Sequence, residues 1–296
     1  MDKLEKRKEL LYSLLLLLAA IIWGFAFVVQ SNAMETIGPL SFNCVRWLIG
    51  SLSVLPVCAL VCGKNREKIK TEDIKEKRKH TLAGGCLCGI FLFAASNTQQ
   101  IGLVETPPGK AGFITALYIV IVPLFGLLRR KIPEIKIWIS VALATAGLYL
   151  MCVTKQLTIE KSDIWVIICA FCYALQIVTV DSFSDRSDPV KLAFVQFLVC
   201  GILGVPFALI FEQPTVAAFR ESLILILYVG VLSSGVAFTL QVVAQKKVKP
   251  TIASLLMSME SVFSVLFSWL VLHQTLSLRE YTGVILMTVA IILAQI

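Results

Sequence analysis

Glu260 is an acidic residue in the middle of an apolar stretch that covers residues 250–272. A stretch of roughly 20 apolar residues is long enough to cross a bilayer as a helix. A carboxyl group at its centre costs about 2.5 kcal/mol or more to insert, so it marks a candidate functional site. Glu260 could bind a cationic group of a ligand or carry a proton. The alternative is a neutral carboxyl group that hydrogen-bonds neighbouring helices.

Aromatic residues occupy the same depth in three other apolar stretches. Trp23, Tyr118 and Tyr173 each lie near the middle of one of them. Their rings could stack on an aromatic ligand or hold a cation over their faces. The alternative is packing between helices. Phe27, one turn after Trp23, is open to both interpretations equally.

Several further residues complete this candidate set, because helical spacing brings them to the same faces. Their polar groups could orient a ligand, although hydrogen bonds between helices would use the same side chains. These candidates are Asn97, Gln100, Gln176, Ser234 and Phe238. Together with Glu260 and the four aromatic residues, they form the predicted binding site, in which Glu260 would also serve as the proton- or cation-coupling residue.

Two other ionisable residues are assigned a structural or gating role. Arg46 lies within the stretch 39–62, about one third of the way in. It could bind a carboxylate, but the preferred interpretation is that it bonds backbone carbonyls at a helix end. His273 follows the stretch 250–272 and could act as a pH-sensitive gate. A histidine at the surface is the preferred interpretation there.

Metal and enzyme chemistry find little support in the sequence. The pairs Cys169-x-x-Cys172 and Cys86-x-Cys88 have spacings seen in metal sites, but no histidine or second cysteine pair lies near them. We therefore interpret these cysteines as small apolar residues, and we expect no metal and no cofactor. His-Glu-x-x-His and Gly-x-Ser-x-Gly motifs are absent from the sequence. The sequence does not predict an enzyme.

The elements that carry these residues are ten apolar stretches. Of the 296 residues, 57% are hydrophobic and only 16% are charged, whereas a soluble domain has about a quarter charged residues. The stretches cover residues 10–30, 39–62, 81–104, 109–128, 135–153, 163–181, 189–211, 222–244, 250–272 and 279–295. Each must be helical, because lipid cannot satisfy exposed backbone groups. The sequence predicts an all-α integral membrane protein with ten transmembrane helices.

The distribution of positive charge predicts the orientation. With the N-terminus placed in the cytoplasm, the cytoplasmic segments hold 21 Lys and Arg residues and the external loops hold 5. This asymmetry places both termini in the cytoplasm, and the expected location is the plasma membrane, crossed many times. The net charge of +8 resides in these short loop clusters, so we expect contact with the lipid bilayer and no nucleic-acid partner. A homodimer is left open.

The two halves of the chain resemble each other. An offset of 150 aligns Pro39–Pro56 with Pro189–Pro206 and Trp23 with Tyr173, and an offset of 142 aligns Tyr118 with Glu260. Since each half holds five helices, an odd number, the second half enters from the opposite side and the repeat is inverted. The predicted organisation is a cytoplasmic tail (1–9), a first five-helix repeat (10–153), an external linker (154–162) and a second repeat (163–296).

The order and spacing of certain residues resemble the EamA branch of the drug/metabolite transporter superfamily. These residues are Trp23-Gly24, Arg46, the segment Lys110–Tyr118 with Pro123, and the segment Ala253–Glu260. The resemblance implies ten helices in two halves. It also implies export or exchange of amino acids and other small metabolites.

These observations combine into one functional expectation. A secondary active transporter would move a small amphipathic metabolite, an amino acid or an amine, out of the cell by alternating access through a midplane pocket. The one acid and the aromatic walls favour a cationic or zwitterionic substrate. The alternative is a channel, or a translocator of lipids or other hydrophobic compounds.

Overall fold

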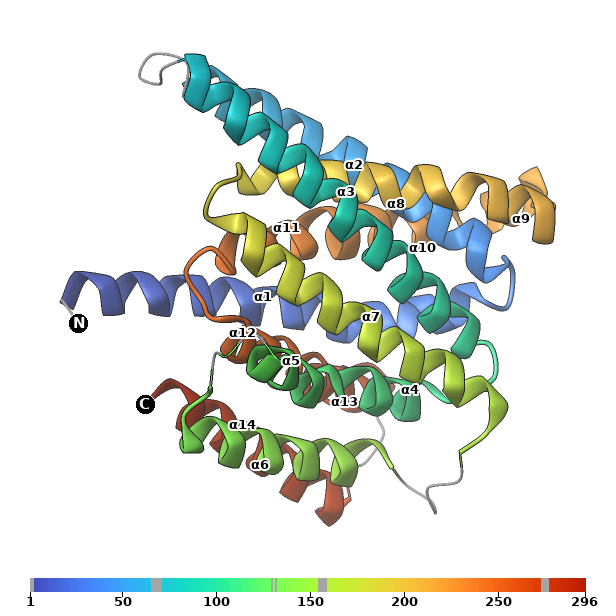
Figure 1. Cartoon of the computed structure of the whole chain (residues 1–296). Coiled ribbons are helices and arrows are strands. Elements are labelled where there is room, and N and C mark those ends of the chain that lie inside the picture. The colour runs from blue at the N-terminus through green and yellow to red at the C-terminus, as the bar shows by residue number, and fades with distance from the viewer. Residues whose placement is uncertain (1–2, 65–70, 129, 131, 154–158, 273–276) are drawn as a thin grey trace.

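The computed structural model describes residues 3–64, 71–128, 130, 132–153, 159–272 and 277–296, and these residues form helices and no strands. Ten segments are long and apolar enough to cross a membrane, which confirms the predicted fold class. Seven of them are single helices: α1 (Lys3–Ala33), α2 (Pro39–Lys64), α3 (Thr71–Gly102), α6 (Ile135–Cys152), α7 (Lys161–Ser184), α8 (Pro189–Phe211) and α14 (Leu278–Gln295). Figure 1 shows the two termini at the same end of the bundle, here called the terminal end.

The other three membrane-spanning segments are interrupted, a feature that the sequence did not predict. The fourth consists of α4 (Pro108–Ala116) and α5 (Tyr118–Leu128), and the ninth of α12 (Pro250–Met257) and α13 (Glu260–Leu272). The eighth contains α10 (Leu223–Tyr228), the π-helical segment η1 (Val229–Ala237) and α11 (Phe238–Ala244), and the short α9 (Val216–Glu221) precedes it. Apolar periodicity does not record such local changes in backbone hydrogen bonding.

Local contacts account for two of these interruptions. In α12 and just after it, the hydroxyl groups of Ser254 and Ser258 donate to backbone carbonyls three residues earlier, at 2.8 and 2.7 Å, and such bonds bend helices. In η1, the backbone at Gly230 approaches α2 so closely that an added Cβ would lie 2.8 Å from Ile49. A π-helical segment lets the backbone adapt to such an approach.

The interruptions of the fourth and ninth segments are related by the internal repeat. The helices α4 and α12 begin at Pro108 and Pro250, and α5 and α13 begin at Tyr118 and Glu260. Both pairs are separated by 142 residues. The inverted repeat therefore extends to the backbone conformation, since both halves break a helix at equivalent positions.

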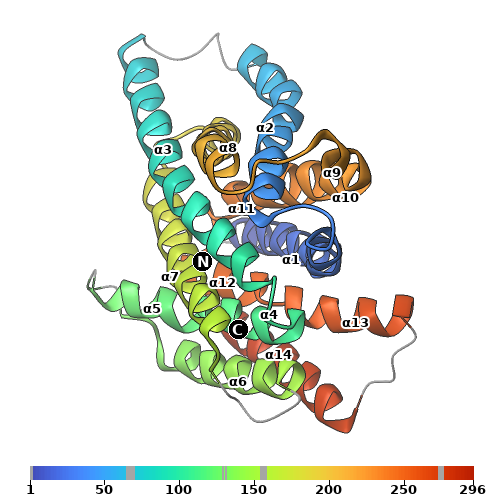
Figure 2. The ribbon, with the colours of Figure 1, turned by 90° about the vertical axis from the view of Figure 1, so that its right-hand side faces the viewer.

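Helix packing follows the same two-fold relation. The helix α1 packs against α13 and η1, as α7 packs against α5 and α3. The pairs α2 with α8 and α6 with α14 each join equivalent helices of the two halves. Figure 2 shows α6 and α14 together on one side of the bundle and α2, α3 and α8 on the other.

The contact between α6 and α14 depends on two glycines that face each other. A Cβ added at Gly283 would lie 2.6 Å from the carbonyl oxygen of Gly147, and one added at Gly147 would lie 2.8 Å from the carbonyl oxygen of Gly283. These two oxygens belong to the backbone, and the Cγ atoms of Met151 and Met287 would also lie within 2.9 Å of the added atoms. An added methyl group can therefore be accommodated only if the two helices move apart.

We expect Gly283→Ala to lower the free energy of unfolding by about 1–3 kcal/mol, the usual cost of overpacking. The measurement is the thermal unfolding temperature in detergent. The matched control is Gly112→Ala, because a Cβ there meets only Ser261 Oγ at 3.9 Å and alanine favours the helix. Equal unfolding temperatures for the two variants would contradict this account of the α6–α14 contact.

Candidate functional site

A cavity of about 50 Å³ lies in the interior of the bundle. A water molecule needs about 10–15 Å³ of such volume, so the cavity holds only a few waters. Its walls come from both halves of the chain. They are Trp23, Phe27, Gln30, Arg46, Gln99, Thr115, Tyr118, Tyr173, Gln176, Ile177, Ser233, Phe238, Gln241, Met257 and Glu260.

Most of these residues occur in pairs related by the internal repeat. The offset of 150 relates Trp23 to Tyr173 and Phe27 to Ile177, and the offset of 142 relates the other pairs. Those other pairs are Gln99 with Gln241, Thr115 with Met257, and Tyr118 with Glu260. A cavity lined by equivalent residues of both halves lies across the pseudo-two-fold axis, which is where inverted-repeat transporters place their binding site.

Glu260 is the acidic residue of the cavity wall and is 6% exposed. It is the first residue of α13, directly after the interruption of the ninth membrane-spanning segment. The hydroxyl group of Tyr118 donates to its Oε1 at 3.5 Å. The helix α1 passes close by, because a Cβ added at Gly24 would lie 2.8 Å from the carbonyl oxygen of Glu260. The interruption and the close crossing of α1 together position this carboxyl group.

Arg46 lies on the same cavity wall and is 2% exposed. Its guanidinium group donates to the side-chain oxygen of Gln30 and lies 4.9 Å from the ring centroid of Trp47. The expected bonds to backbone carbonyls are not among its described hydrogen bonds. Its Nε is buried and has no hydrogen-bond partner among the described residues, so this donor is available to a group in the cavity.

Phe238 is the centre of the aromatic wall. Its ring centroid lies 4.7 Å from that of Trp23 and 6.4 Å from that of Tyr173. The indole Nε1 of Trp23 donates to the carbonyl oxygen of Ser233 in η1 at 3.2 Å. The two repeat-related aromatic residues therefore flank one ring, and the π-helical segment anchors one of them.

Amide side chains form a chain of hydrogen bonds along another wall. Gln241 Nε2 donates to Gln176 Oε1 and to Gln245 Oε1, both at 3.0 Å. Gln176 Nε2 donates in turn to Gln196 Oε1 at 3.2 Å. On the first-half side, the hydroxyl group of Tyr173 donates to Gln99 Oε1 at 3.4 Å.

The structure brings seven of the ten predicted binding residues to the cavity. They are Trp23, Phe27, Tyr118, Tyr173, Gln176, Phe238 and Glu260. Their role in binding stays a prediction. The other predicted gating residue, His273, lies outside the described residues.

Three predicted residues lie away from the cavity wall. Asn97 donates to the carbonyl oxygen of Phe93 at 2.9 Å, and Gln100 donates to that of Gln30 at 3.4 Å. Ser234 packs closely against Gly50 of α2. The sequence shows which residues share a helical face but not which neighbour that face meets, and the role of these three residues stays a prediction.

Several residues of the cavity wall lie outside the predicted set. Gln30, Gln99, Thr115, Ile177, Ser233, Gln241 and Met257 line the cavity without having been predicted. The repeat contained a signal for some of them, since the offset of 142 aligns Gln99 with Gln241. The predicted Asn97 and Gln100 are close neighbours of Gln99 in the sequence.

Comparison with known proteins identifies the family. The EamA-like transporter family matches residues 10–153 and, a second time, residues 160–295. The chain belongs to this family. Its membership and its ten apolar helices make it a multi-pass membrane transporter, which acts on a small-molecule substrate within a lipid bilayer.

Individual relatives agree with the EamA assignment. An uncharacterized transporter of Archaeoglobus fulgidus is 31% identical over 293 residues, which cover 99% of this chain and 88% of that protein. The uncharacterized transporter YoaV of Bacillus subtilis is 21% identical over 274 residues, or 90% of each chain. A crystal structure with 15% identity superposes with a TM-score of 0.76 and covers 96% of both chains, which shows the shared fold.

We expect Gln241→Leu to destabilise the protein by about 1–3 kcal/mol, because it leaves buried amide oxygens of Gln176 and Gln245 without a donor. Thermal unfolding in detergent measures the effect. The matched control is Gln295→Leu, since Gln295 is exposed at the end of α14. If both variants unfold at the wild-type temperature, the amide chain does not stabilise the cavity wall.

Proposed function

We propose that this protein is a secondary active transporter that exports a small amphipathic metabolite, an amino acid or an amine, by alternating access through the central cavity. The main observation in support of this proposal is that the cavity lies across the pseudo-two-fold axis, with Glu260 and Arg46 in its walls. A site shared by two inverted halves can open to either face when one half rocks against the other.

The chemistry of the walls supports a substrate with an amino group. The carboxyl group of Glu260 can pair with a substrate ammonium group, and the rings of Trp23, Tyr173 and Phe238 can pack against its apolar part or hold its cationic group. The unpaired Nε of Arg46 can donate to a substrate carboxylate. Groups of opposite charge in one cavity suit a zwitterion, because each substrate charge finds a partner away from water.

The size of the cavity requires movement. About 50 Å³ of free volume is too small for an amino acid, so the walls must separate before a substrate enters. The interruptions at the start of α5 and of α13 supply joints at which half-helices can tilt. These joints lie beside Tyr118 and Glu260, so tilting would change the site itself.

Orientation and coupling complete the proposal. The excess of positive charge at the terminal end supports a cytoplasmic location for that end, and the membrane of the proposal is the plasma membrane. Export would be driven by the gradient of the substrate or by protons, and Glu260 would carry the proton.

The proposal is tested first by identifying a ligand. Purified protein is screened with single amino acids and monoamines, since a ligand that binds only the folded state raises the unfolding temperature. Ligands found in this way are assayed in proteoliposomes for uptake of labelled compound. Stimulation of uptake by unlabelled compound inside indicates a carrier. Flux without such stimulation and without saturation would indicate a channel instead.

We expect Glu260→Gln to reduce transport of the identified compound at least about tenfold, because the amide can neither carry the negative charge nor exchange a proton. The matched control is Glu105→Gln, which removes an exposed carboxylate that does not line the cavity and should leave the rate unchanged. Transport at the wild-type rate in Glu260→Gln would exclude a role for this carboxyl group.

A further inference from the structure

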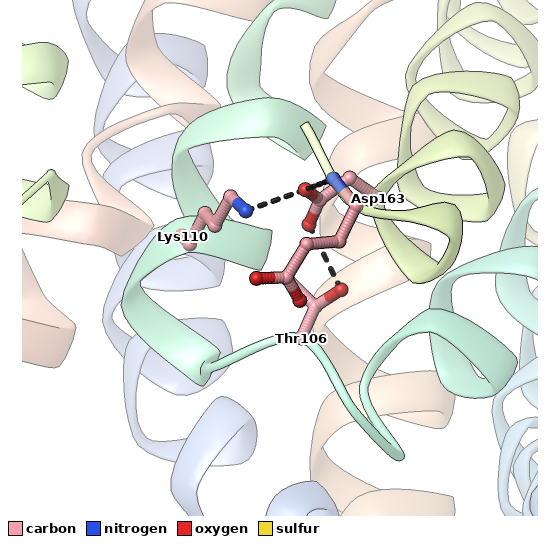
Figure 3. A network of polar contacts seen from close by, with 4 residues as sticks. Thr106, Lys110 and Asp163 are labelled. Atoms are coloured by element: carbon pink, nitrogen blue, oxygen red, sulfur yellow. Dashed lines mark hydrogen bonds and ion pairs between the residues drawn. The ribbon is translucent and has the colours of Figure 1, made fainter. Parts of the chain in front are cut away.

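Lys110, Asp163 and Thr106 form a polar network at the end of the bundle opposite the termini. The ammonium group of Lys110 lies 2.5 Å from Asp163 Oδ2, and the hydroxyl group of Thr106 donates to Asp163 Oδ1 at 3.0 Å. Figure 3 shows both groups directed at the carboxylate of Asp163. The side chain of Asp163 is only 1% exposed and that of Lys110 is 18% exposed.

This ion pair joins the two halves of the protein. Lys110 lies in the first turn of α4, in the first half, and Asp163 lies in the first turn of α7, in the second half. Asp163 Oδ2 also accepts a hydrogen bond from the backbone amide of Glu160 at 2.8 Å, which fixes the carboxylate at the N-terminus of α7. Helices of opposite halves are therefore held together at this end by a nearly buried ion pair.

The internal repeat identifies the equivalent positions at the terminal end. The offset of 150 relates Asp163 to Ser13, and the offset of 142 relates Lys110 to Ile252. Ser13 and Ile252 both line a recess of about 910 Å³ at the terminal end. A serine and an isoleucine cannot form an ion pair. At one end of the molecule these positions form an ion pair between two helices. At the other end the equivalent positions border a recess.

The recess extends towards the central cavity. Among its lining residues, Val122 lies one helical turn after Tyr118, and Val178 directly follows Ile177. Tyr118 and Ile177 both line the central cavity. The recess therefore reaches residues within about one helical turn of the site, whereas the Lys110–Asp163 network lies at the opposite end.

We propose that Lys110 and Asp163 are the gating residues of the external face, and that this structure is the state closed to the outside and approached from the cytoplasm. The inference rests on the alternating-access function proposed above. Opening to the outside separates α4 from α7 and breaks the ion pair. The equivalent positions at the terminal end, Ser13 and Ile252, carry no charge, so the pair biases the transporter towards its inward-facing state.

The test measures access to the cavity from outside and needs no substrate. Thr115 lines the cavity, so Thr115→Cys is introduced and its reaction with a membrane-impermeant charged maleimide is followed in right-side-out vesicles. The chain without this substitution gives the background from the native cysteines. We expect Lys110→Met to accelerate external labelling of Thr115→Cys at least about fivefold, a typical coupling between two conformational states.

Two matched variants distinguish the effect of losing this ion pair from the effect of losing a positive charge in general. Lys110→Arg keeps a cation opposite Asp163, and labelling should stay slow. Lys161→Met removes an exposed lysine at the same end of the bundle, and labelling should also stay slow. Unchanged labelling in Lys110→Met, with unfolding temperature preserved, would overturn the proposal, and so would equally fast labelling in Lys161→Met.

A second experiment introduces an ion pair instead of removing one, and it tests the proposal even if Lys110→Met does not fold. Ser13→Asp combined with Ile252→Lys places the same two charges at the equivalent positions of the terminal end. We expect this pair to hold the cytoplasmic face closed and to accelerate external labelling of Thr115→Cys. The uncharged control is Ser13→Asn with Ile252→Met. Equal labelling in both double variants would overturn the gate assignment.

Labelling and transport also distinguish failure of the gate from failure of the proposed function. If labelling responds as expected while no amino acid or amine is transported, the gate is supported and the substrate assignment fails. If transport depends on Glu260 while labelling is insensitive to Lys110 and to the introduced pair, the transporter assignment holds and the gate is overturned.

Discussion

A backbone amide or carbonyl group inside a bilayer finds no water, and this constraint shapes the whole molecule. Ten helices satisfy their own backbone groups across the membrane. Irregular backbone is tolerated in lipid only where protein or a cavity surrounds it. The interruptions of the fourth, eighth and ninth membrane-spanning segments meet this condition, because Tyr118, Ser233 and Glu260 at these places all line the central cavity.

The inverted repeat converts these local irregularities into one site. Equivalent interruptions in α4–α5 and α12–α13 approach the pseudo-two-fold axis from opposite faces of the membrane. They place Tyr118 and Glu260, which occupy equivalent positions, within hydrogen-bonding distance of each other. Divergence at equivalent positions then supplies the chemistry, since one half contributes a phenol and the other a carboxyl group. A perfectly repeated pair would provide two like groups instead of a donor and an acceptor.

The sequence predicted the number of helices and the repeat, because apolar length and offset are one-dimensional properties. It also led to Trp23, Tyr118, Tyr173 and Glu260, whose depth along a helix can be counted. It did not predict the interruptions, which arise from packing such as the approach of Gly230 to α2. It did not show that Gln99 lines the cavity, because the rotation of α3 about its axis depends on neighbours that are distant in the sequence.

Divergence between the two repeats also explains why the two ends of the molecule differ. Symmetry alone would make the inward-facing and outward-facing states equal in energy, since each is the other with its halves exchanged. Any preference must come from positions where the repeat has diverged. Lys110 and Asp163 at one end correspond to the diverged residues Ile252 and Ser13 at the other end. The nearly buried ion pair at one end, with uncharged residues at the equivalent positions of the other, is such a difference, and under the proposed gate it gives the transporter a resting orientation.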